Sequence, residues 1–152
     1  MLRPDESARI VRERLRRGDL CLASWSGNQI VGAVWVRFDR IWVSELGRSL
    51  LVRPEEAYGY AAFIEPGQRG RGAASALYLR TLRRLKSLGY RRALSYVARE
   101  NLAGHAPLWW LGFEYVGRIR WFHVGRFGLE LMTRRDERPR LRVHVRAPRS
   151  QE

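Results

Sequence analysis

The chain has 152 residues, enough for one domain with a hydrophobic core, and its 45% hydrophobic and 11% aromatic content excludes a disordered chain. No apolar run approaches the roughly 20 residues that span a bilayer, and the first residues lack the apolar segment of a secretory signal. The single cysteine, Cys21, excludes a disulfide framework and a cysteine-based metal site, and the net charge of +14 excludes an acidic protein.

The N-terminal segment, residues 1–18, predicts one helix. Apolar residues recur at helical spacing between Asp5 and Arg17, Asp5 is the expected N-cap, and Gly18 ends the helix. We expect the main domain to begin directly afterwards.

Three β-rich segments follow. Residues 20–25 and 29–38 flank Ser-Gly-Asn and predict a hairpin, in which Cys21 is expected to be a buried strand residue. Residues 57–64 predict a third strand, which ends at Pro-Gly. Residues 39–56 are ambiguous, and a further strand around 41–43 is one interpretation.

The clearest helical pattern runs from Ala74 to a stop at Gly89. It has one apolar stripe, and arginines lie on the opposite face. Residues 91–98 predict a short strand after this crossover helix, which implies a parallel βαβ unit.

The next segment, residues 101–113, predicts another helix with Asn101 near its start and Gly112 as C-cap. Residues 114–124 and 127–132 predict a closing hairpin. The main domain is therefore expected to span residues 19–132.

The remaining residues, 133–152, are polar, rich in arginine and read as a basic tail. Within the tail, residues 141–146 alternate apolar and basic side chains with period two, which leaves an edge strand and a disordered segment equally open.

The positive charge comes from 29 Lys and Arg against 15 Asp and Glu. It favours a polyanionic partner such as nucleic acid, an acidic membrane or a phosphorylated ligand. However, Lys86 is the only lysine, and the arginines are spread along the whole chain, as the coding preference of a G+C-rich genome would also produce. Nucleic acid is therefore an alternative partner rather than the favoured one. The lack of a disulfide framework fits a cytoplasmic location.

One stretch, Gln68 to Leu77 (QRGRGAASAL), carries the chemistry. It lacks the Lys-Ser/Thr of a P-loop and the glycine spacing of a dinucleotide fingerprint. Its position between a strand and a helix directs backbone N–H groups to one spot at the positive end of the helix dipole. Glycines at 70 and 72 leave room for a phosphate to approach the main chain. This geometry suits a pyrophosphate.

The same stretch resembles the coenzyme A loop of the GNAT superfamily of N-acetyltransferases, whose pattern is Arg/Gln-x-x-Gly-x-Gly/Ala. The preceding strand, the amphipathic helix, Asn101 and Leu-Gly-Phe at 111–113 follow in the family's order. The similarity covers about residues 20–132. It implies an α/β (α+β) fold with a mixed, mostly antiparallel sheet, a splayed parallel strand pair and helices on both faces.

The resemblance also implies the cosubstrate, acetyl-CoA, and no metal. In the family, acetyl-CoA lies where two parallel strands separate, here 57–64 and 92–97. Backbone groups of the strand end and of the loop would hold the cosubstrate, and the side chain of Asn101 would contact its pantetheine arm. The backbone groups belong to Phe63, Ile64, Arg69, Gly70, Arg71, Gly72, Ala73 and Ala74. An amide near Phe63 or Ile64 would polarise the acetyl carbonyl, and Arg69 or Arg71 would pair with a phosphate.

The residues that move protons are less clearly indicated, because Leu108 stands where many family members have a tyrosine acid. Tyr96 stands where some have a carboxylate base. From position alone, Tyr96 is the candidate acid, and Glu65, His105 or Glu56 is the candidate base.

The first strand of the family is expected to be shortened or missing here, because only about 18 residues precede the hairpin. Residues 141–146, from this chain or a neighbouring copy, would then cover the exposed sheet edge, and a homodimer is plausible. The predicted function is transfer of an acetyl group to a primary amine, on a small molecule or a peptide. The alternatives are a CoA-binding regulator that has lost turnover and a basic nucleic-acid-binding module.

Overall fold

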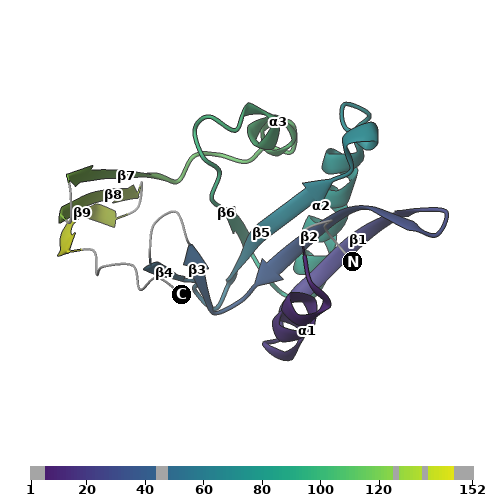
Figure 1. Ribbon diagram of the computed structural model, residues 1–152, viewed down its shortest axis with the longest axis horizontal. Coiled ribbons are helices and arrows are strands. Elements are labelled where there is room, and N and C mark those ends of the chain that lie inside the picture. The colour runs from purple at the N-terminus through teal and green to yellow at the C-terminus, as the bar shows by residue number, and fades with distance from the viewer. Residues whose placement is uncertain (1–5, 44–47, 125–126, 135–136, 146–152) are drawn as a thin grey trace. The chain divides into compact units, whose positions relative to one another are not determined.

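The chain forms two compact units, residues 1–113 and residues 114–152, in a computed structural model (Figure 1). The residues that the structure describes are 6–43, 48–124, 127–134 and 137–145. Along the chain, the boundary between the two units lies between Phe113 and Glu114.

The first unit contains three helices, a 3₁₀ turn and six strands among its described residues. In chain order these are α1 (Ala8–Arg16), β1 (Leu20–Ser26), β2 (Gln29–Arg37), β3 (Arg40–Val43), β4 (Arg48–Leu51), β5 (Glu56–Ile64), η2 (Pro66–Gln68), α2 (Ala73–Ser87), β6 (Arg92–Ser95) and α3 (Leu102–Trp110). The second unit contains β7 (Gly117–Val124), β8 (Phe127–Arg134) and β9 (Glu137–Val145).

The main sheet has the strand order β1-β2-β5-β6. The pairs β1–β2 and β2–β5 are antiparallel, whereas β5 and β6 are parallel and are connected through α2. The predicted fold class, a mixed α/β sheet with one parallel pair, is confirmed.

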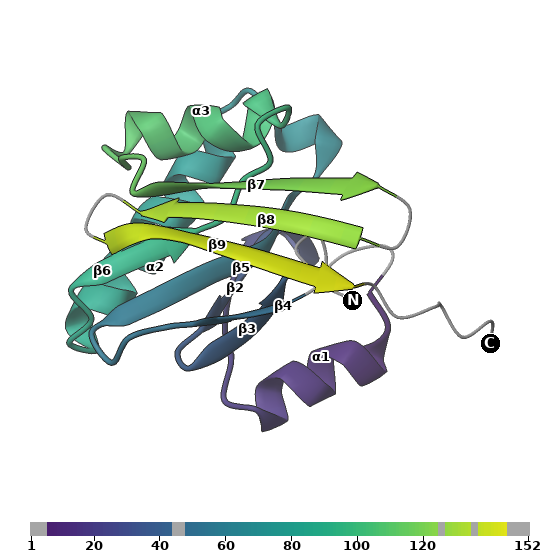
Figure 2. The ribbon, with the colours of Figure 1, turned by 90° about the vertical axis from the view of Figure 1, so that its left-hand side faces the viewer.

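The two faces of this sheet differ in chemistry. On the α2 side, Val36 and Ala57 pack with Leu85 of α2 in a dry core. On the other side, Trp35 of β2 and Tyr60 of β5 are cross-strand partners, and Arg14 of α1 lies over both rings. Side chains alternate along each strand, so α1 and α2 belong to opposite faces, with the strands running between them (Figure 2).

The N-terminal helix differs from the prediction in its cap. Ser7 is the N-cap, and its hydroxyl accepts a hydrogen bond from the amide of Ile10 at 3.4 Å. Asp5, the predicted cap, lies outside the described residues. Gly18 ends the helix as predicted, with a φ of 80°.

The ambiguous segment before β5 contains a second hairpin. Strands β3 and β4 pair antiparallel in a sheet of their own. Ile41 and Val43 are buried, whereas Trp42 between them is 63% exposed, so the alternation of β3 gives the hairpin one inner and one outer face.

The second unit is a three-stranded antiparallel sheet of order β7-β8-β9. The predicted closing hairpin corresponds to β7 and β8. The predicted edge-strand segment lies in β9, but β9 pairs with β8, with Leu141 opposite Leu131. The expectation that this segment covers the free edge of the main sheet stays a prediction.

Candidate functional site

The parallel strands β5 and β6 separate part of the way along β5. Their register pairs Glu56 with Arg92 and ends with Gly59 opposite Ser95. The Ser95 hydroxyl donates to the Gly59 carbonyl at 3.1 Å, which satisfies that oxygen at the point of separation. Strand β5 continues to Ile64 without β6 beside it, because β6 ends at Ser95 rather than at the predicted residue 98. Within residues 1–113, no described strand pairs with this edge of the last residues of β5, which is called the open edge below.

A β-bulge reorients the backbone of β5 at this point. Ala33 of β2 pairs with Phe63 of β5, and Trp35 pairs with Tyr60. One residue separates the two paired positions on β2 and two residues separate them on β5, so β5 has one extra residue. Ala61 lies in the bulge with a φ of 46°, a conformation that is unfavourable for a non-glycine residue. A strained backbone beside an open strand edge is a common feature of functional sites.

The two residues after the bulge face opposite sides of the sheet. Phe63 is the cross-strand partner of Ala33, on the side of Trp35. Ile64 faces α2, because a Cβ added at Gly32 would lie 2.8 Å from its side chain. The next amide, that of Glu65, donates to Val31 of β2 at 2.9 Å. Successive residues direct their backbone groups to opposite edges of a strand, so the Ile64 amide faces the open edge.

A glycine loop joins β5 to α2. Gly70 and Gly72 have φ values of 71° and 78°, and a Cβ at either position would meet no atom within 4 Å. Glycine is therefore required by backbone conformation, and added side chains would project into the space in front of the helix.

The N-terminus of α2 has no side-chain cap among the residues that the structure describes. Its N-cap residue, Gly72, offers no side chain, and the first turn has no acidic residue. The first backbone amide to reach an acceptor at this end is that of Ala76, which donates to Gly72 at 3.0 Å. The amides before it in the first turn have no helical acceptor. By contrast, Ser7 caps α1 and Asn101 caps α3.

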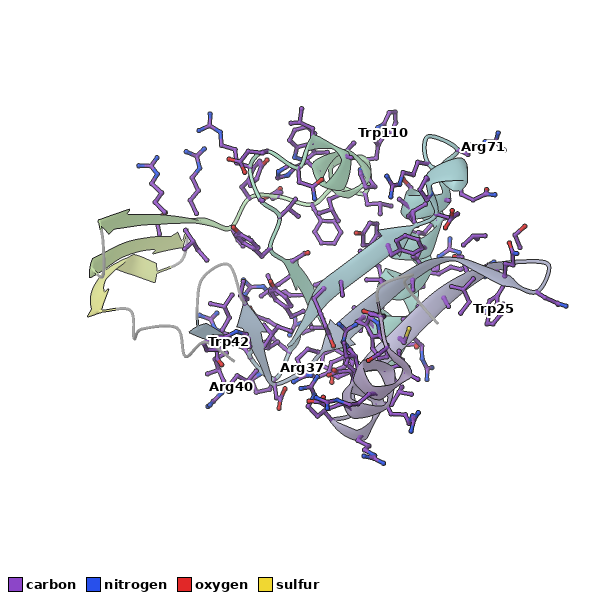
Figure 3. All side chains as sticks on the ribbon, in the orientation of Figure 1. Trp25, Arg37, Arg40, Trp42, Arg71 and Trp110 are labelled. Carbon is purple, nitrogen blue, oxygen red and sulfur yellow. The ribbon has the colours of Figure 1, made fainter. Side chains whose placement is uncertain are left out.

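Arg69 and Arg71 belong to this loop but differ in placement. The Arg69 side chain folds back, and its Nε donates to the carbonyl of Ile64 at 3.0 Å, which ties the loop to the open end of β5. Arg71 is exposed at the outer side of the loop (Figure 3).

Asn101 stands at the start of α3, shortly after the end of β6. Its side-chain oxygen accepts a hydrogen bond from the Gly104 amide at 3.0 Å, as predicted for a helix cap. Gly104 has no Cβ, and one added there would lie 2.8 Å from the Asn101 side-chain nitrogen. Asn101 as a whole is exposed.

The candidate proton-transfer residues lie in different environments. Glu65 is exposed at the end of β5, and Tyr96 is half-buried directly after β6. His105 is buried, with its Nε2 3.0 Å from the Ala98 carbonyl and its ring stacked on Trp109. The structure thus brings Glu65 and Tyr96 to the ends of the two separating strands, while the His105 ring is engaged with the backbone of the loop after β6.

Glu56 and Leu108 are both buried. Glu56 lies at the first residue of β5, with Arg92 3.6 Å away, so it is at the end of the strand opposite the glycine loop. Leu108 packs on the inner side of α3 and supplies no proton.

Sequence reasoning missed a polar cluster on the α1 side of the sheet. Asp19 is fully buried and accepts hydrogen bonds from Arg37, through both Nε and a terminal nitrogen, and from the Tyr60 hydroxyl at 2.6 Å. Burial, reinforced by the bond to Asp19, raises the pKa of Tyr60. The hydrogen bond to Asp19 likewise raises the pKa of Arg37.

A second buried pair adjoins the first. Arg14 of α1 donates to Glu6 at 2.6 Å, and its guanidinium carbon lies 5.1 Å from the ring centres of both Trp35 and Tyr60. Cys21 is half-buried nearby, and burial followed by the Glu6 carboxylate raises its pKa to about 11. A charged residue at an inward position of a predicted strand, such as Arg37, is the sequence feature from which this cluster could have been predicted.

Other features of the described residues provide no alternative site. The hollow of about 360 Å³ beside Ala106, Trp109 and Trp110 is lined by α3 alone. In the described part of the chain, no cluster of three or more His, Cys, Asp and Glu side chains is arranged to hold a metal ion. None of the helices described has the length and apolarity needed to cross a bilayer.

The described site is a glycine loop and an uncapped helix start that lie between a bulged strand and a crossover helix. The sequence model of the Acetyltransferase (GNAT) family matches residues 2–124. The chain therefore belongs to the GNAT acetyltransferase family, and the predicted enzyme class is confirmed. A search of curated proteins by sequence found no match.

Solved structures share this fold at low identity. A complex of AAC(6')-Iy with the bisubstrate analogue CoA-S-monomethyl-acetylneamine has 18% identity and a TM-score of 0.61, over 81% of this chain and 84% of that chain. An acetyltransferase from Trypanosoma brucei has 19% identity and a TM-score of 0.55, over 77% of each chain. The aminoglycoside acetyltransferase meta-AAC0020 from an uncultured soil metagenomic sample, in complex with sisomicin, has 11% identity and a TM-score of 0.58, over 78% and 74%.

Proposed function

We propose that this acetyltransferase transfers the acetyl group of acetyl-CoA to a primary amine by direct attack. One observation carries the proposal: the N-terminus of α2 lacks a cap and an acidic residue, and it follows a positive-φ glycine loop at the open end of β5. Free amides at a helix N-terminus bind phosphate groups. Solved neighbours in complex with CoA or a CoA conjugate support the choice of cosubstrate.

The backbone amides from Arg69 to Ala74 would hold the pyrophosphate, and the side-chain amide of Asn101 would contact the pantetheine arm. The amide of Ile64 faces the open strand edge, so of the two predicted carbonyl-polarising positions we favour Ile64 over Phe63. A preorganised donor of this kind lowers the barrier of acyl transfer by roughly 3–4 kcal/mol. Acetyl-CoA supplies the activated thioester, and these residues bind and orient it.

An amine arrives protonated and must lose a proton before attack, and the departing sulfur must gain one. Glu65, exposed at the end of β5, is the proposed base, and Tyr96 at the end of β6 is the proposed acid. His105 remains a second candidate base, although its Nε2 lies 3.0 Å from the Ala98 carbonyl. Positioning of the two substrates and polarisation of the acetyl carbonyl accelerate the transfer even when no acid or base side chain takes part.

The other predictions about context remain proposals: a cytoplasmic location, a homodimer and a small-molecule or peptide amine as acceptor. A CoA-binding regulator without turnover is the second candidate function. It is favoured by Leu108, which is buried and cannot act as an acid at the position where many family members have a tyrosine.

Calorimetric titration with acetyl-CoA tests the proposal. We expect the wild type to bind and Gly72→Glu to lose binding, because the new carboxylate would occupy the space in front of the α2 amides. Gly89→Glu is the matched control: it lies at the other end of α2, has a φ of 91° and would meet no atom within 4 Å. If the wild type does not bind acetyl-CoA, or if Gly72→Glu binds it equally well, the proposed pyrophosphate site at the start of α2 is refuted. Acetyl transfer to a panel of amines then separates the enzyme from the regulator.

A further inference from the structure

Arg69 begins the glycine loop, but its side chain returns to the end of β5. The peptide group between Ile64 and Glu65 is planar and trans, so its N–H and its C=O point in opposite directions. The N–H donates to the carbonyl of Val31 on β2 at 2.9 Å. The C=O therefore faces the open edge, where the Arg69 Nε donates to it at 3.0 Å. Hydrogen bonds thus hold this peptide group from both sides.

Both backbone groups of Ile64 face the open edge. Its N–H is the donor proposed to polarise the acetyl carbonyl, and its C=O carries a partial negative charge on the same side of the strand. A carbonyl oxygen without a donor would oppose the negative charge that develops on the acetyl oxygen during attack. A hydrogen bond from a guanidinium is charge-assisted and offsets this partial charge. Arg69 therefore changes the surroundings of the proposed acetyl position through Ile64.

The turn that leads into the loop has backbone hydrogen bonds of its own. The Gln68 amide donates to the Glu65 carbonyl at 2.9 Å, and the Arg69 amide donates to the Pro66 carbonyl at 3.2 Å. Neither bond uses a side chain, so both remain when the side chain of Arg69 is changed. The Arg69 side chain is therefore more important for the end of β5 than for the path of the loop.

Arg71, two residues further along, has different surroundings. It is exposed at the outer side of the loop (Figure 3), and no hydrogen bond or ion pair to its guanidinium is found in the described part of the chain. A guanidinium whose donors are all available suits the oxygens of a phosphate. Of the two arginines that the sequence linked to a phosphate, Arg71 is therefore the better candidate.

We propose that Arg69 is a positioning residue for acetyl transfer. Its Nε fixes the peptide group between Ile64 and Glu65 at the open edge and neutralises the Ile64 carbonyl, while Arg71 pairs with a phosphate of the cosubstrate. The proposal rests on the proposed acetyltransferase function. It assigns two arginines of one loop to different parts of acetyl-CoA, one to the thioester and one to the phosphates.

Two replacements of Arg69 isolate the observed hydrogen bond. The side-chain nitrogen of Arg69→Gln is as many bonds from Cα as the arginine Nε is, so this variant keeps the donor to Ile64 and loses only the charge. Arg69→Met has a side chain of the same length without a donor. Arg69 is exposed, so neither change opens the core, and circular dichroism checks that both variants fold. A difference between the two variants therefore reports the hydrogen bond rather than the charge.

Calorimetry with two ligands tests the assignment without catalysis. Adenosine 3′-phosphate 5′-diphosphate is the phosphate-bearing half of coenzyme A. We expect the Gln and Met variants of Arg69 to bind it equally, and Arg71→Ala to bind it at least about fivefold more weakly than the wild type does. For acetyl-CoA, we expect Arg69→Met to bind about fivefold more weakly than Arg69→Gln.

Three calorimetric results would overturn the assignment. If the Gln and Met variants differ in binding the phosphate-bearing half, the hydrogen bond of Arg69 serves the phosphate site. If the two variants bind acetyl-CoA equally, the bond does not act on the acetyl end. If Arg71→Ala binds the phosphate-bearing half as the wild type does, Arg71 is not its partner.

Acetyl transfer to the best amine of the panel separates positioning from binding. With acetyl-CoA, we expect the kcat of Arg69→Met to be about tenfold below that of Arg69→Gln, with a smaller change in KM. We expect the same ratio in kcat/KM with S-acetylpantetheine, which has no phosphate. Equal rates for the two variants would contradict the proposal. If acetyl-CoA binds but no amine is acetylated, the proposed enzymatic function fails, while the calorimetric comparison still decides the role of Arg69.

Discussion

Replacement of Asp19 by Asn should be among the most destabilising single changes in the first unit. The Asp19 side chain is fully buried and accepts hydrogen bonds from Arg37 and Tyr60, and the Arg37 side chain is only 12% exposed. Asn keeps the shape but removes the charge, so the guanidinium stays buried without its counterion. Breaking one partner of a buried ion pair costs about 3–5 kcal/mol. A domain of this size has about 5–15 kcal/mol of stability in total.

Urea unfolding of the wild type, Asp19→Asn, Arg37→Gln and the double variant measures the interaction. We expect the double variant to be less destabilised than the sum of the singles, with a coupling free energy of about 2 kcal/mol. Asp39→Asn is the matched control, because its carboxylate lies 3.8 Å from the same Arg37 but is 78% exposed. That change should cost about 0.5 kcal/mol or less. If Asp19→Asn costs no more than Asp39→Asn, the buried network does not stabilise the sheet as argued.

Three further predictions concern the loop, a cap and the thiol. Gly72→Ala should lower stability by about 1 kcal/mol in urea unfolding and weaken acetyl-CoA binding in calorimetry, whereas Gly67→Ala in the same loop, where φ is not positive, should do neither. Asn101→Ala should cost about 1 kcal/mol of stability, whereas Asn101→Asp keeps the cap; weaker acetyl-CoA binding by the Asp variant at wild-type stability would show that the side-chain NH₂ contacts the cosubstrate. Because burial and Glu6 raise the pKa of Cys21 from 9.0 to about 11, the folded chain retains a proton that the unfolded chain has lost. Its free energy of unfolding should therefore fall as the pH rises from 9.0 towards 11, and a Cys21→Ser variant should lose this component; an unchanged pH dependence would contradict the assignment.

Local sequence determined much of the proposed cosubstrate site. Gly70 and Gly72, expected from the sequence to leave room for a phosphate, have positive φ values, which glycine adopts readily. Asn101 caps α3 as its position suggested. Caps and positive-φ turns involve residues within a few positions of one another, so their physical cause is present in a short stretch of sequence. The parallel pair could be predicted for a related reason, since a strand, helix and strand in succession favour one topology.

Only the tertiary structure decided the chemistry of the α1 face of the main sheet. Asp19 contacts Arg37 and Tyr60 at sequence separations of 18 and 41 residues, and Arg14 reaches Trp35 and Tyr60 from a helix. These contacts depend on strand register and on the packing of α1, and a shift of one residue would turn every side chain to the opposite face. The bulge at Ala61 and the end of β6 at Ser95 also depend on pairing between strands. The sequence alone thus determined the glycine loop and the helix start at which we propose that phosphates bind. The fold decided which side chains meet on the α1 face of the main sheet, because that face is assembled from segments distant in the chain.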